Sequence, residues 1–234
     1  DIDMPQFRVR KGRKIVRGTL FLDPTPAQHV ALLPWLGLTD LTGGVYAMGA
    51  TDVLTEKDVK IDLGAEQHNW SNCIVRSYAW RGSKGGRPVS WQIDIEGEDE
   101  TFPGTSFTAN PLTVNKIYSF CDIATRKIDN ASGVLTDRPV DRFLIQVDNR
   151  VVSEWNSSVT RTGAKIADRQ GVFATSAPYT STHKDLYTTP RDSEGPMEAN
   201  LKLTNSDGSI EFFMPGCVPI TEGPSVLGKP DQIR

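Results

Sequence analysis

The stretch FLIQVDNRVVSEWNSS, from Phe143 to Ser158, decides the fold class. Apolar residues stand at every second position from Phe143 to Val147, the period of two that is typical of a β-strand with two unequal faces. A second alternating run extends from Val151 to Trp155. Asp148 and Asn149 separate the two runs, and both residue types favour tight turns because they tolerate left-handed backbone. The pattern therefore predicts a β-hairpin.

Both faces of this hairpin carry apolar residues, because Leu144 and Val152 fall on the side opposite to the main apolar set. Such a ribbon requires cover on its second side, either from another layer or from another chain. We therefore interpret it as a scaffold or assembly surface. The candidate assembly residues are Phe143, Ile145, Val147, Asp148, Asn149, Val151 and Trp155, together with Arg161 and Arg169 from the polar stretch that follows.

Further β signals continue along the chain and predict strands at 14–23, 58–64, 71–82, 88–98, 114–128 and 197–214. The glycine-rich basic turn RGSKGGR joins two of these runs, and Ser206-Asp207-Gly208 is predicted as a three-residue turn. One short helix is expected after Pro24 and Pro26, with a stop at Gly37. Many strands and one flanking helix predict a mainly β fold, a β-sandwich or barrel with long loops.

Residues 156–196 differ from the rest, because they are rich in Ser, Thr, Gly, Asp and Arg and hold only scattered apolar residues. This composition predicts one long polar loop. Loops beyond about 15 residues in compact domains are usually functional or mobile, and a loop of this length is costly unless something orders it. We treat 1–234 as a single β domain with an N-terminal arm at 1–13 and a C-terminal arm at 215–234.

Composition and charge narrow the function classes. The chain has 38% hydrophobic and 24% charged residues, which is typical of a folded globular protein. Its formal net charge of −3 argues against a sequence-independent nucleic-acid binder that is basic overall, but it is compatible with a local basic patch. No apolar run approaches about 18 residues, so no transmembrane helix is predicted. The three cysteines at 73, 121 and 217 form no disulfide or metal pattern, and we expect a reducing compartment.

A search for catalytic and binding motifs finds none. His29, His68 and His183 are isolated, and no metal-ligand spacing or nucleophile elbow occurs. The acidic run DIEGEDE at 94–100 is interpreted as a solvated strand end, and GSKGGR at 82–87 as a turn, because neither has the spacing of a calcium or phosphate loop. We therefore predict no cofactor, no metal and no enzymatic activity.

The order of elements resembles that of the tail tube, or major tail, proteins of long-tailed bacteriophages. The resemblance lies in the two-strand block NCIVRSYAWRGSKGGRPVSWQIDIEGEDE and in the strand that ends in VDN at 147–149. A long polar loop and the final hairpin LKLTNSDGSIEFFMPG complete the order, which covers residues 14–214.

This resemblance implies a β-sandwich whose copies form homo-hexameric rings stacked head to tail into a hollow tube. The inner wall would be a β-barrel built from every subunit, with the 156–196 loop and the terminal arms reaching between subunits. The implied partners are further copies of the chain, a tape-measure protein, and tail terminator and tip proteins. Double-stranded DNA would pass without specific binding. The implied location is the tail of the virion, assembled in the host cytoplasm.

Two alternatives remain open from the sequence. A carbohydrate-binding or adhesion module would use tryptophans such as Trp70, Trp80, Trp91 and Trp155 as a sugar platform. A β-rich hydrolase would require one of the three histidines to meet a carboxylate and a nucleophile in one cleft.

Overall fold

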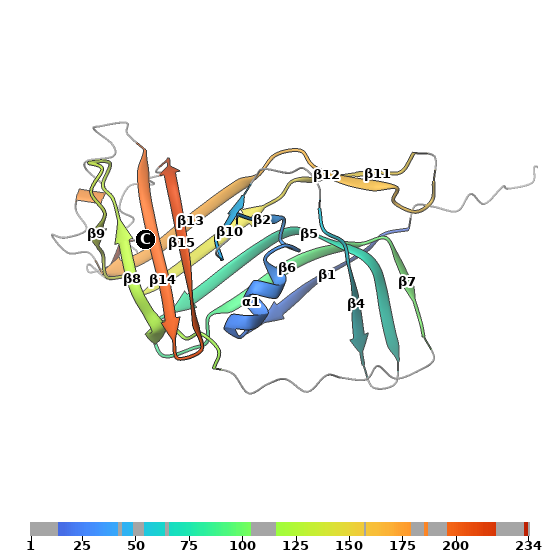
Figure 1. Ribbon diagram of the computed structural model, residues 1–234, viewed down its shortest axis with the longest axis horizontal. Coiled ribbons are helices and arrows are strands. Elements are labelled where there is room, and N and C mark those ends of the chain that lie inside the picture. Colours follow the sequence, from blue (N-terminus) through green and yellow to red (C-terminus); the bar gives the residue numbers. More distant parts are fainter. Residues whose placement is uncertain are drawn as a thin grey trace, which may run out of the picture.

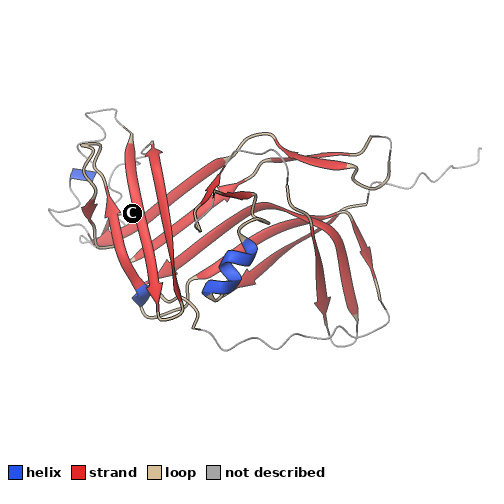
Figure 2. Cartoon of the chain, in the orientation of Figure 1, coloured by secondary structure: helices blue, strands red, loops and turns tan. Residues whose placement is uncertain are grey.

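Two layers of antiparallel strands build the fold, as Figures 1 and 2 show. The computed structural model describes residues 14–41, 44–48, 54–63, 66–103, 116–156, 158–178, 185–186, 196–218 and 232–233. The predicted mainly β, sandwich-like architecture with one short flanking α-helix is confirmed. The arm at 1–13 lies outside the described residues, as do large parts of the C-terminal arm and of the 179–195 stretch.

The larger sheet has the central strand order β1-β6-β5-β10-β13, and every neighbouring pair is antiparallel. Its strands are β1 (Val16–Leu22), β5 (Gln67–Ser83), β6 (Ser90–Gly97), β10 (Arg142–Asp148) and β13 (Gln170–Pro178). Only the end of β13, at Ala177 and Pro178, also pairs with the short β16 (Gln232–Ile233). The predicted turn between β5 and β6 is confirmed, with Gly85 and Gly86 at positive φ.

Strand β5 is long enough for its two halves to pair with different strands of this sheet. Its C-terminal half lies between β6 and β10, whereas its N-terminal half pairs with β4 (Lys57–Asp62) and β7 (Asp99–Thr101). Figure 1 shows β4, β7 and this half of β5 extending together away from the rest of the molecule. We call these three segments the arm sheet.

The second layer is a four-stranded sheet of order β15-β14-β8-β9. Its strands are β8 (Ile123–Ile128), β9 (Thr136–Asp137), β14 (Met197–Asn205) and β15 (Gly208–Cys217), and the 3-10 helix η1 (Phe120–Asp122) precedes β8. The predicted strand at 114–128 is therefore shorter than expected. The turn between β14 and β15 holds two residues, Ser206 and Asp207, because Gly208 already pairs with Asn205.

The main core lies between the two layers. Trp80 and Trp91 of the larger sheet, with Leu201 and Leu203 of β14, are almost completely buried in one cluster. Helix α1 (Pro26–Leu32) closes one side of it, beginning at a Thr25 capping box. Its His29 ring contacts the Trp91 ring with centroids 4.1 Å apart. The predicted helix and its proline start are confirmed, but the predicted stop at Gly37 is wrong, because the helix already ends at Leu32.

Two short hairpins complete the described chain. One is formed by β2 (Leu38–Asp40) and β3 (Tyr46–Met48), and the other by β11 (Val151–Glu154) and β12 (Gly163–Ile166). We call the second hairpin the flap. None of the helices in the described ranges is long and apolar enough to cross a membrane.

The predicted hairpin at 143–155 is wrong. Strand β10 pairs with β5 and β13, and β11 pairs with β12 in a separate sheet, so the two runs never pair with each other. The reason is Asn149, which is fully buried. Its backbone N–H donates to the Arg76 carbonyl, and its side-chain amide donates to the carbonyls of Val75 and Leu36. These bonds hold the corner against β5, so the chain leaves the sheet instead of folding back.

The predicted polar loop at 156–196 is also wrong in its first part, because β12 and β13 both lie within it. Strand β13 is a full member of the larger sheet, in register with β10 from Arg142 opposite Ser176 to Asp148 opposite Gln170. Its sequence QGVFATSAP is small and polar at many positions, because its outward face meets no second layer in the described chain. A strand of this kind has a weak apolar alternation.

Candidate assembly surface

The two edge strands of the larger sheet have backbone edges with no partner in the described chain. Strand β1 pairs with β6 alone, and β13 pairs with β10 and, at its last two residues, with β16. Unpaired N–H and C=O groups along a strand edge are a template for pairing with another chain. Because four antiparallel steps separate β1 from β13, the two edge strands run in the same direction.

Exposed apolar side chains accompany both edges. Phe21 of β1 is 73% exposed, and Val172 of β13 is 39% exposed. The β2–β3 hairpin adds the exposed Met48, whose Cε lies 3.8 Å from where a Cβ on Gly171 of β13 would stand. Exposed apolar residues on an unpaired strand edge mark an interaction surface or an aggregation liability.

The outer face of the five central strands is the face opposite the main core. Register and alternation place on it Thr19 and Phe21 from β1, Gln92, Asp94 and Glu96 from β6, Ser77, Ala79 and Arg81 from β5, Leu144, Gln146 and Asp148 from β10, and Val172, Ala174 and Ser176 from β13. Half of these side chains are uncharged and small or polar, and most of the others are charged. This face is therefore built to meet water or a polar partner.

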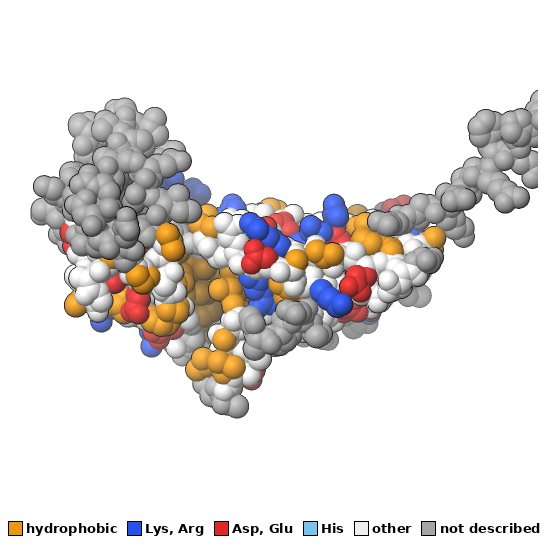
Figure 3. Space-filling model, turned by 90° about the horizontal axis from the view of Figure 1, so that it is seen from above, with side chains coloured by type: hydrophobic (Ala, Val, Ile, Leu, Met, Phe, Trp, Pro, Cys, Tyr) orange, Lys and Arg blue, Asp and Glu red, His pale blue; other side chains and the backbone are white. Residues whose placement is uncertain are grey.

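The flap covers one end of the outer face. Val151 of β11 packs there with Ile74 of β5 and with Leu54, and Ala164 and Ile166 of β12 lie against the same cluster. Figure 3 views the molecule from above relative to Figure 1, and basic and acidic side chains lie next to one another among apolar ones. The flap thus has a small apolar core of its own, separate from the main core.

Glu96 fixes the flap to the larger sheet through a buried carboxylate. Its Oε1 accepts from Ser153 Oγ of the flap at 2.6 Å, and its Oε2 accepts from Arg76 Nη1 at 2.6 Å and Arg17 Nε at 3.0 Å. Burial alone would raise the pKa of this carboxyl, but the hydrogen bonds from Ser153, Arg76 and Arg17 outweigh it and hold the pKa below its ordinary value of 4.5. The prediction that residues 94–100 form a solvated strand end is wrong for Glu96, which is 1% exposed.

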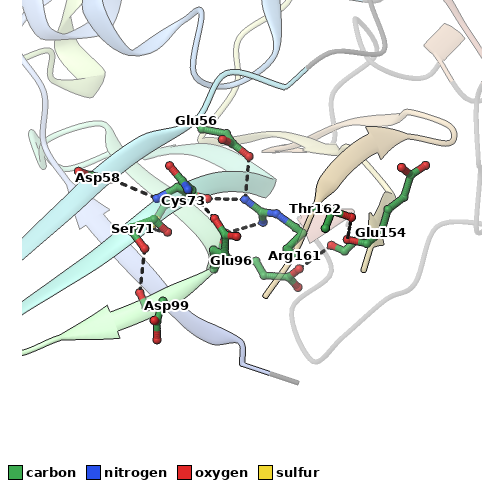
Figure 4. Close-up of polar contacts among 12 residues, drawn as sticks. Glu56, Asp58, Ser71, Cys73, Glu96, Asp99, Glu154, Arg161 and Thr162 are labelled. Atoms are coloured by element: carbon green, nitrogen blue, oxygen red, sulfur yellow. Dashed lines mark hydrogen bonds and ion pairs between the residues drawn. The ribbon is translucent and has the colours of Figure 1, made fainter. Parts of the chain in front are cut away.

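Arg161 is the second residue that holds the flap against the larger sheet. Its guanidinium is buried, and Figure 4 shows it reaching from the flap toward Glu56 and the strands of the larger sheet. Nη2 donates to the Asn72 carbonyl and, at 3.0 Å, to Glu56 Oε1, while Nη1 donates to the Glu96 carbonyl at 3.3 Å. Asn72 has a φ of 49° where the β4–β5 register shifts, which frees its carbonyl from the ladder.

The sequence-predicted assembly residues have other roles within the chain. Phe143, Ile145 and Val147 are core residues, and Val151 belongs to the flap cluster. Asn149 and Arg161 are buried and bonded to backbone carbonyls, and Arg169 donates to the Gly37 carbonyl at 2.7 Å. Asp148 is exposed and accepts from the Arg150 N–H, and Trp155 is half-buried. Contacts within the chain account for the burial of these side chains, so they do not mark the open edges.

The edges themselves were missed by sequence reasoning. The strand at 14–23 was predicted, but nothing in its residues tells an edge strand from a central one. Strand β13 was hidden in a stretch of polar composition. The alternation of Gly171, Phe173 and Thr175, which face the core, with Val172 and Ala174 is too weak to reveal this strand, because the outward set is as apolar as the inward set.

The tryptophans give little support to a sugar platform, because Trp35, Trp80 and Trp91 are each at most 3% exposed. Trp70 and Trp155 are partly exposed, but Trp70 Nε1 donates to Glu100 at 2.8 Å.

The histidines supply only part of a hydrolase site. His68 Nδ1 lies 2.7 Å from Glu100 Oε1, and the nearest charged neighbour of Nε2 is Glu66 at 3.8 Å. His29 is buried among aromatic rings, and His183 lies outside the described residues. Within the described ranges no three His, Cys, Asp or Glu side chains gather to hold a metal ion.

No protein-family model matches the chain, and no curated protein matches it significantly.

Proposed function

We propose that this chain is a structural subunit that joins further copies of itself through the edges of its larger sheet, forming rings that stack into the tail tube of a long-tailed bacteriophage. The proposal requires no catalysis and no cofactor. It locates the protein in the tail of the virion, after assembly in the host cytoplasm.

One observation carries the proposal: along most of their length, the outer edges of β1 and β13 in the larger sheet have no partner in the described chain, and both strands bear exposed apolar residues. A stable monomer usually protects such edges with charges, bulges or covering segments. Pairing β1 of one copy with β13 of the next removes both edges at once.

The direction of the two strands supports a ring. Copies related by rotation about one axis present β1 to β13 of the neighbour, a heterologous contact that closes when the rotation divides a full turn. Since β1 and β13 run in the same direction, the new pair is parallel. A two-fold dimer through β1 would instead pair it antiparallel with itself and leave β13 free.

In such a ring the outer face forms one continuous surface, while the core and the second sheet lie on its other side. An inner wall made from the outer face would be lined by serine, threonine, glutamine and alanine side chains together with charged ones such as Arg81, Asp94 and Asp148. Homo-hexameric closure, head-to-tail stacking and contact with tape-measure, terminator and tip proteins come from the resemblance to tail tube proteins.

Negative-stain electron microscopy of the purified chain over a concentration series tests the proposal. Phe21→Lys places a charge on the β1 edge, and Phe213→Lys makes the same change on β15 of the second sheet, where Phe213 is 53% exposed. We expect rings or tubes from the natural chain, none from Phe21→Lys, and normal assembly from Phe213→Lys. Discrete small particles at every concentration would overturn the proposal and favour the carbohydrate-binding alternative. If only Phe213→Lys lost assembly, the result would show that the interface lies on the second sheet.

A further inference from the structure

A group of basic side chains lies at the end of the larger sheet that is remote from the flap. Arg81 is near the end of β5, Lys84 and Arg87 belong to the turn that follows, and Arg142 begins β10. All four are exposed. We call these four residues the basic rim.

Register brings the two arginines of the strands together on the outer face. Arg81 is opposite Leu144, and Arg142 is opposite Ser83, so the two arginines are diagonal neighbours on adjacent strands. Diagonal neighbours on one sheet face are within reach of long side chains. Lys84 lies beside them, because its backbone N–H donates to the Asp141 carbonyl at 2.8 Å.

The charges of the basic rim are poorly compensated. No ion pair within 4.0 Å forms between Arg81, Arg87 or Arg142 and any described carboxylate, and Lys84 reaches Asp141 only at 3.5 Å. By contrast, Arg17 and Arg76 are bound to Glu96. In a chain whose net charge is −3, a cluster of four cations with one weakly bound carboxylate is a local excess.

Asp94 lies on the same face, and its charge interacts with that of Arg81 without forming an ion pair within 4.0 Å. Its two carboxylate oxygens accept from the hydroxyls of Thr19 and Ser77, each at 2.6 Å.

The side chains around the two arginines favour phosphate as the ligand. Arg81 is flanked in register by Ser90, and Arg142 by Ser83 and Ser176, all on the outer face. Guanidinium groups bind phosphate through paired hydrogen bonds, and serine hydroxyls donate to phosphate oxygens. Three of the four residues in register with the two arginines are thus serines, and Leu144 opposite Arg81 is the one apolar side chain among them.

We propose that the basic rim binds the phosphate backbone of double-stranded DNA without reading its sequence. The contact is electrostatic, because each cation that meets a phosphate releases counterions from the duplex. The inference goes beyond the proposed function and needs no ring for its test. In a ring that exposes the outer face to the bore, the basic rim of every copy would form a collar at one mouth.

The test measures binding of a fluorescently labelled duplex to the chain by anisotropy, between about 50 and about 200 mM salt. The variant Arg81→Gln/Arg142→Gln removes two charges from the basic rim. Its matched control, Lys127→Gln/Lys202→Gln, removes two charges from the second sheet. Sedimentation of the same samples reports the assembly state, so DNA binding by unassembled chains would support this inference even where the proposed function fails.

We expect salt-dependent binding that is independent of duplex sequence. In the arginine double variant, binding should weaken about tenfold at the lower salt, and the slope of log affinity against log salt should fall by about 1.8, which is 0.9 for each lost phosphate contact. Arg81→Lys/Arg142→Lys, which keeps the charge, should retain most of the binding, and the control should match the natural chain. The proposal is overturned if the natural chain does not bind, or if the control loses as much as the arginine variant. Displacement of the duplex by polyglutamate at equal charge would instead assign the basic rim to an acidic protein.

Discussion

The side-chain amide nitrogen of Asn149 lies 3.0 Å from the carbonyl oxygen of Val75 and binds the Leu36 carbonyl as well, so one buried residue joins three segments that are distant in sequence. Asn149→Ala leaves both carbonyls without this donor, and we expect it to lower the free energy of unfolding by about 1–3 kcal/mol. Asn149→Asp places a carboxylate against two carbonyl oxygens in a fully buried site, and it should cost at least about 3 kcal/mol. Urea unfolding followed by tryptophan fluorescence measures both effects.

Gln146→Ala is the matched control, because Gln146 is in the same strand and its side chain is exposed on the outer face. Its effect should remain within about 0.5 kcal/mol. Equal effects of Asn149→Ala and Gln146→Ala would contradict the role of Asn149 as the residue that directs the corner.

The same residue shows how far the sequence predicts this region. The strand character of 143–147 and 151–154 is visible in the alternation, and so is the break between them. The pairing of the strands is not visible in the sequence, because a turn-favouring Asn is equally suited to a hairpin and to a corner. The pairing depends on acceptors at Val75 and Leu36, which are 74 and 113 residues away.

Gly18 lies directly beneath the indole ring of Trp70, so β1 and the arm sheet are in close contact. A Cβ on Gly18 would stand 2.6 Å from both Cη2 and Cζ3 of Trp70, closer than side chains approach one another. We expect Gly18→Ala to displace the ring or the strand and to destabilise the fold by about 1–3 kcal/mol. If β1 is an assembly edge, the same variant should also impair ring formation, which microscopy would detect.

Gly171→Ala is the control for this prediction, because a Cβ there meets only Met48 Cε at an ordinary 3.8 Å in a strand of the same sheet. It should leave stability nearly unchanged. Replacing Trp70 with Leu in the Gly18→Ala background should recover part of the loss, since the ring no longer fills the space. A Gly18→Ala chain as stable as the natural one would show that Trp70 moves freely.

Arg161 should decide whether the flap stays closed. In Arg161→Met the carbonyls of Asn72 and Glu96 lose their donor and Glu56 loses its ion pair. We expect a loss of about 2–3 kcal/mol, with faster amide hydrogen exchange in β11 and β12 than in β10 and β13. Lys165→Met in the flap is the control, because Lys165 is exposed and its contact with Glu154 should be worth less than about 1 kcal/mol. Uniform acceleration of exchange across both sheets would mean that Arg161 supports the whole fold.

The contacts of Arg161 and Glu96 could not be predicted from the sequence, for a physical reason. Arg161 falls in a polar stretch and Glu96 in an acidic run, and charge runs are usually solvated. Both are buried because the flap folds over the outer face. The flap can be recognised only once it is known that the apolar side chain of Ile74 lies on that face. Position along the sheet, which no local pattern encodes, decides which charges become structural.

His29 should make the fold sensitive to mild acid. Its ring is 2% exposed, neither ring nitrogen has a hydrogen-bond partner among the described residues, and burial lowers the pKa to about 3 from 6.5. Between these values the unfolded chain binds a proton that the folded chain does not. The free energy of unfolding should therefore fall as pH decreases below about 6.5, by up to about 1.4 kcal/mol per pH unit. In His29→Leu this component of the slope should be absent.

The window between pH 6 and 5 isolates this effect from the carboxylate of Glu96. Because the pKa of Glu96 is held below 4.5, its contribution to stability is fully present above that pH and is lost only as pH falls further. Val30→Ala, an exposed position in the same helix, should keep the slope of the natural chain. Urea unfolding at closely spaced pH values measures the three slopes. Equal slopes for the natural chain and His29→Leu would mean that the folded state accepts the proton at His29, and that water reaches the aromatic cluster around Trp91 and Tyr118.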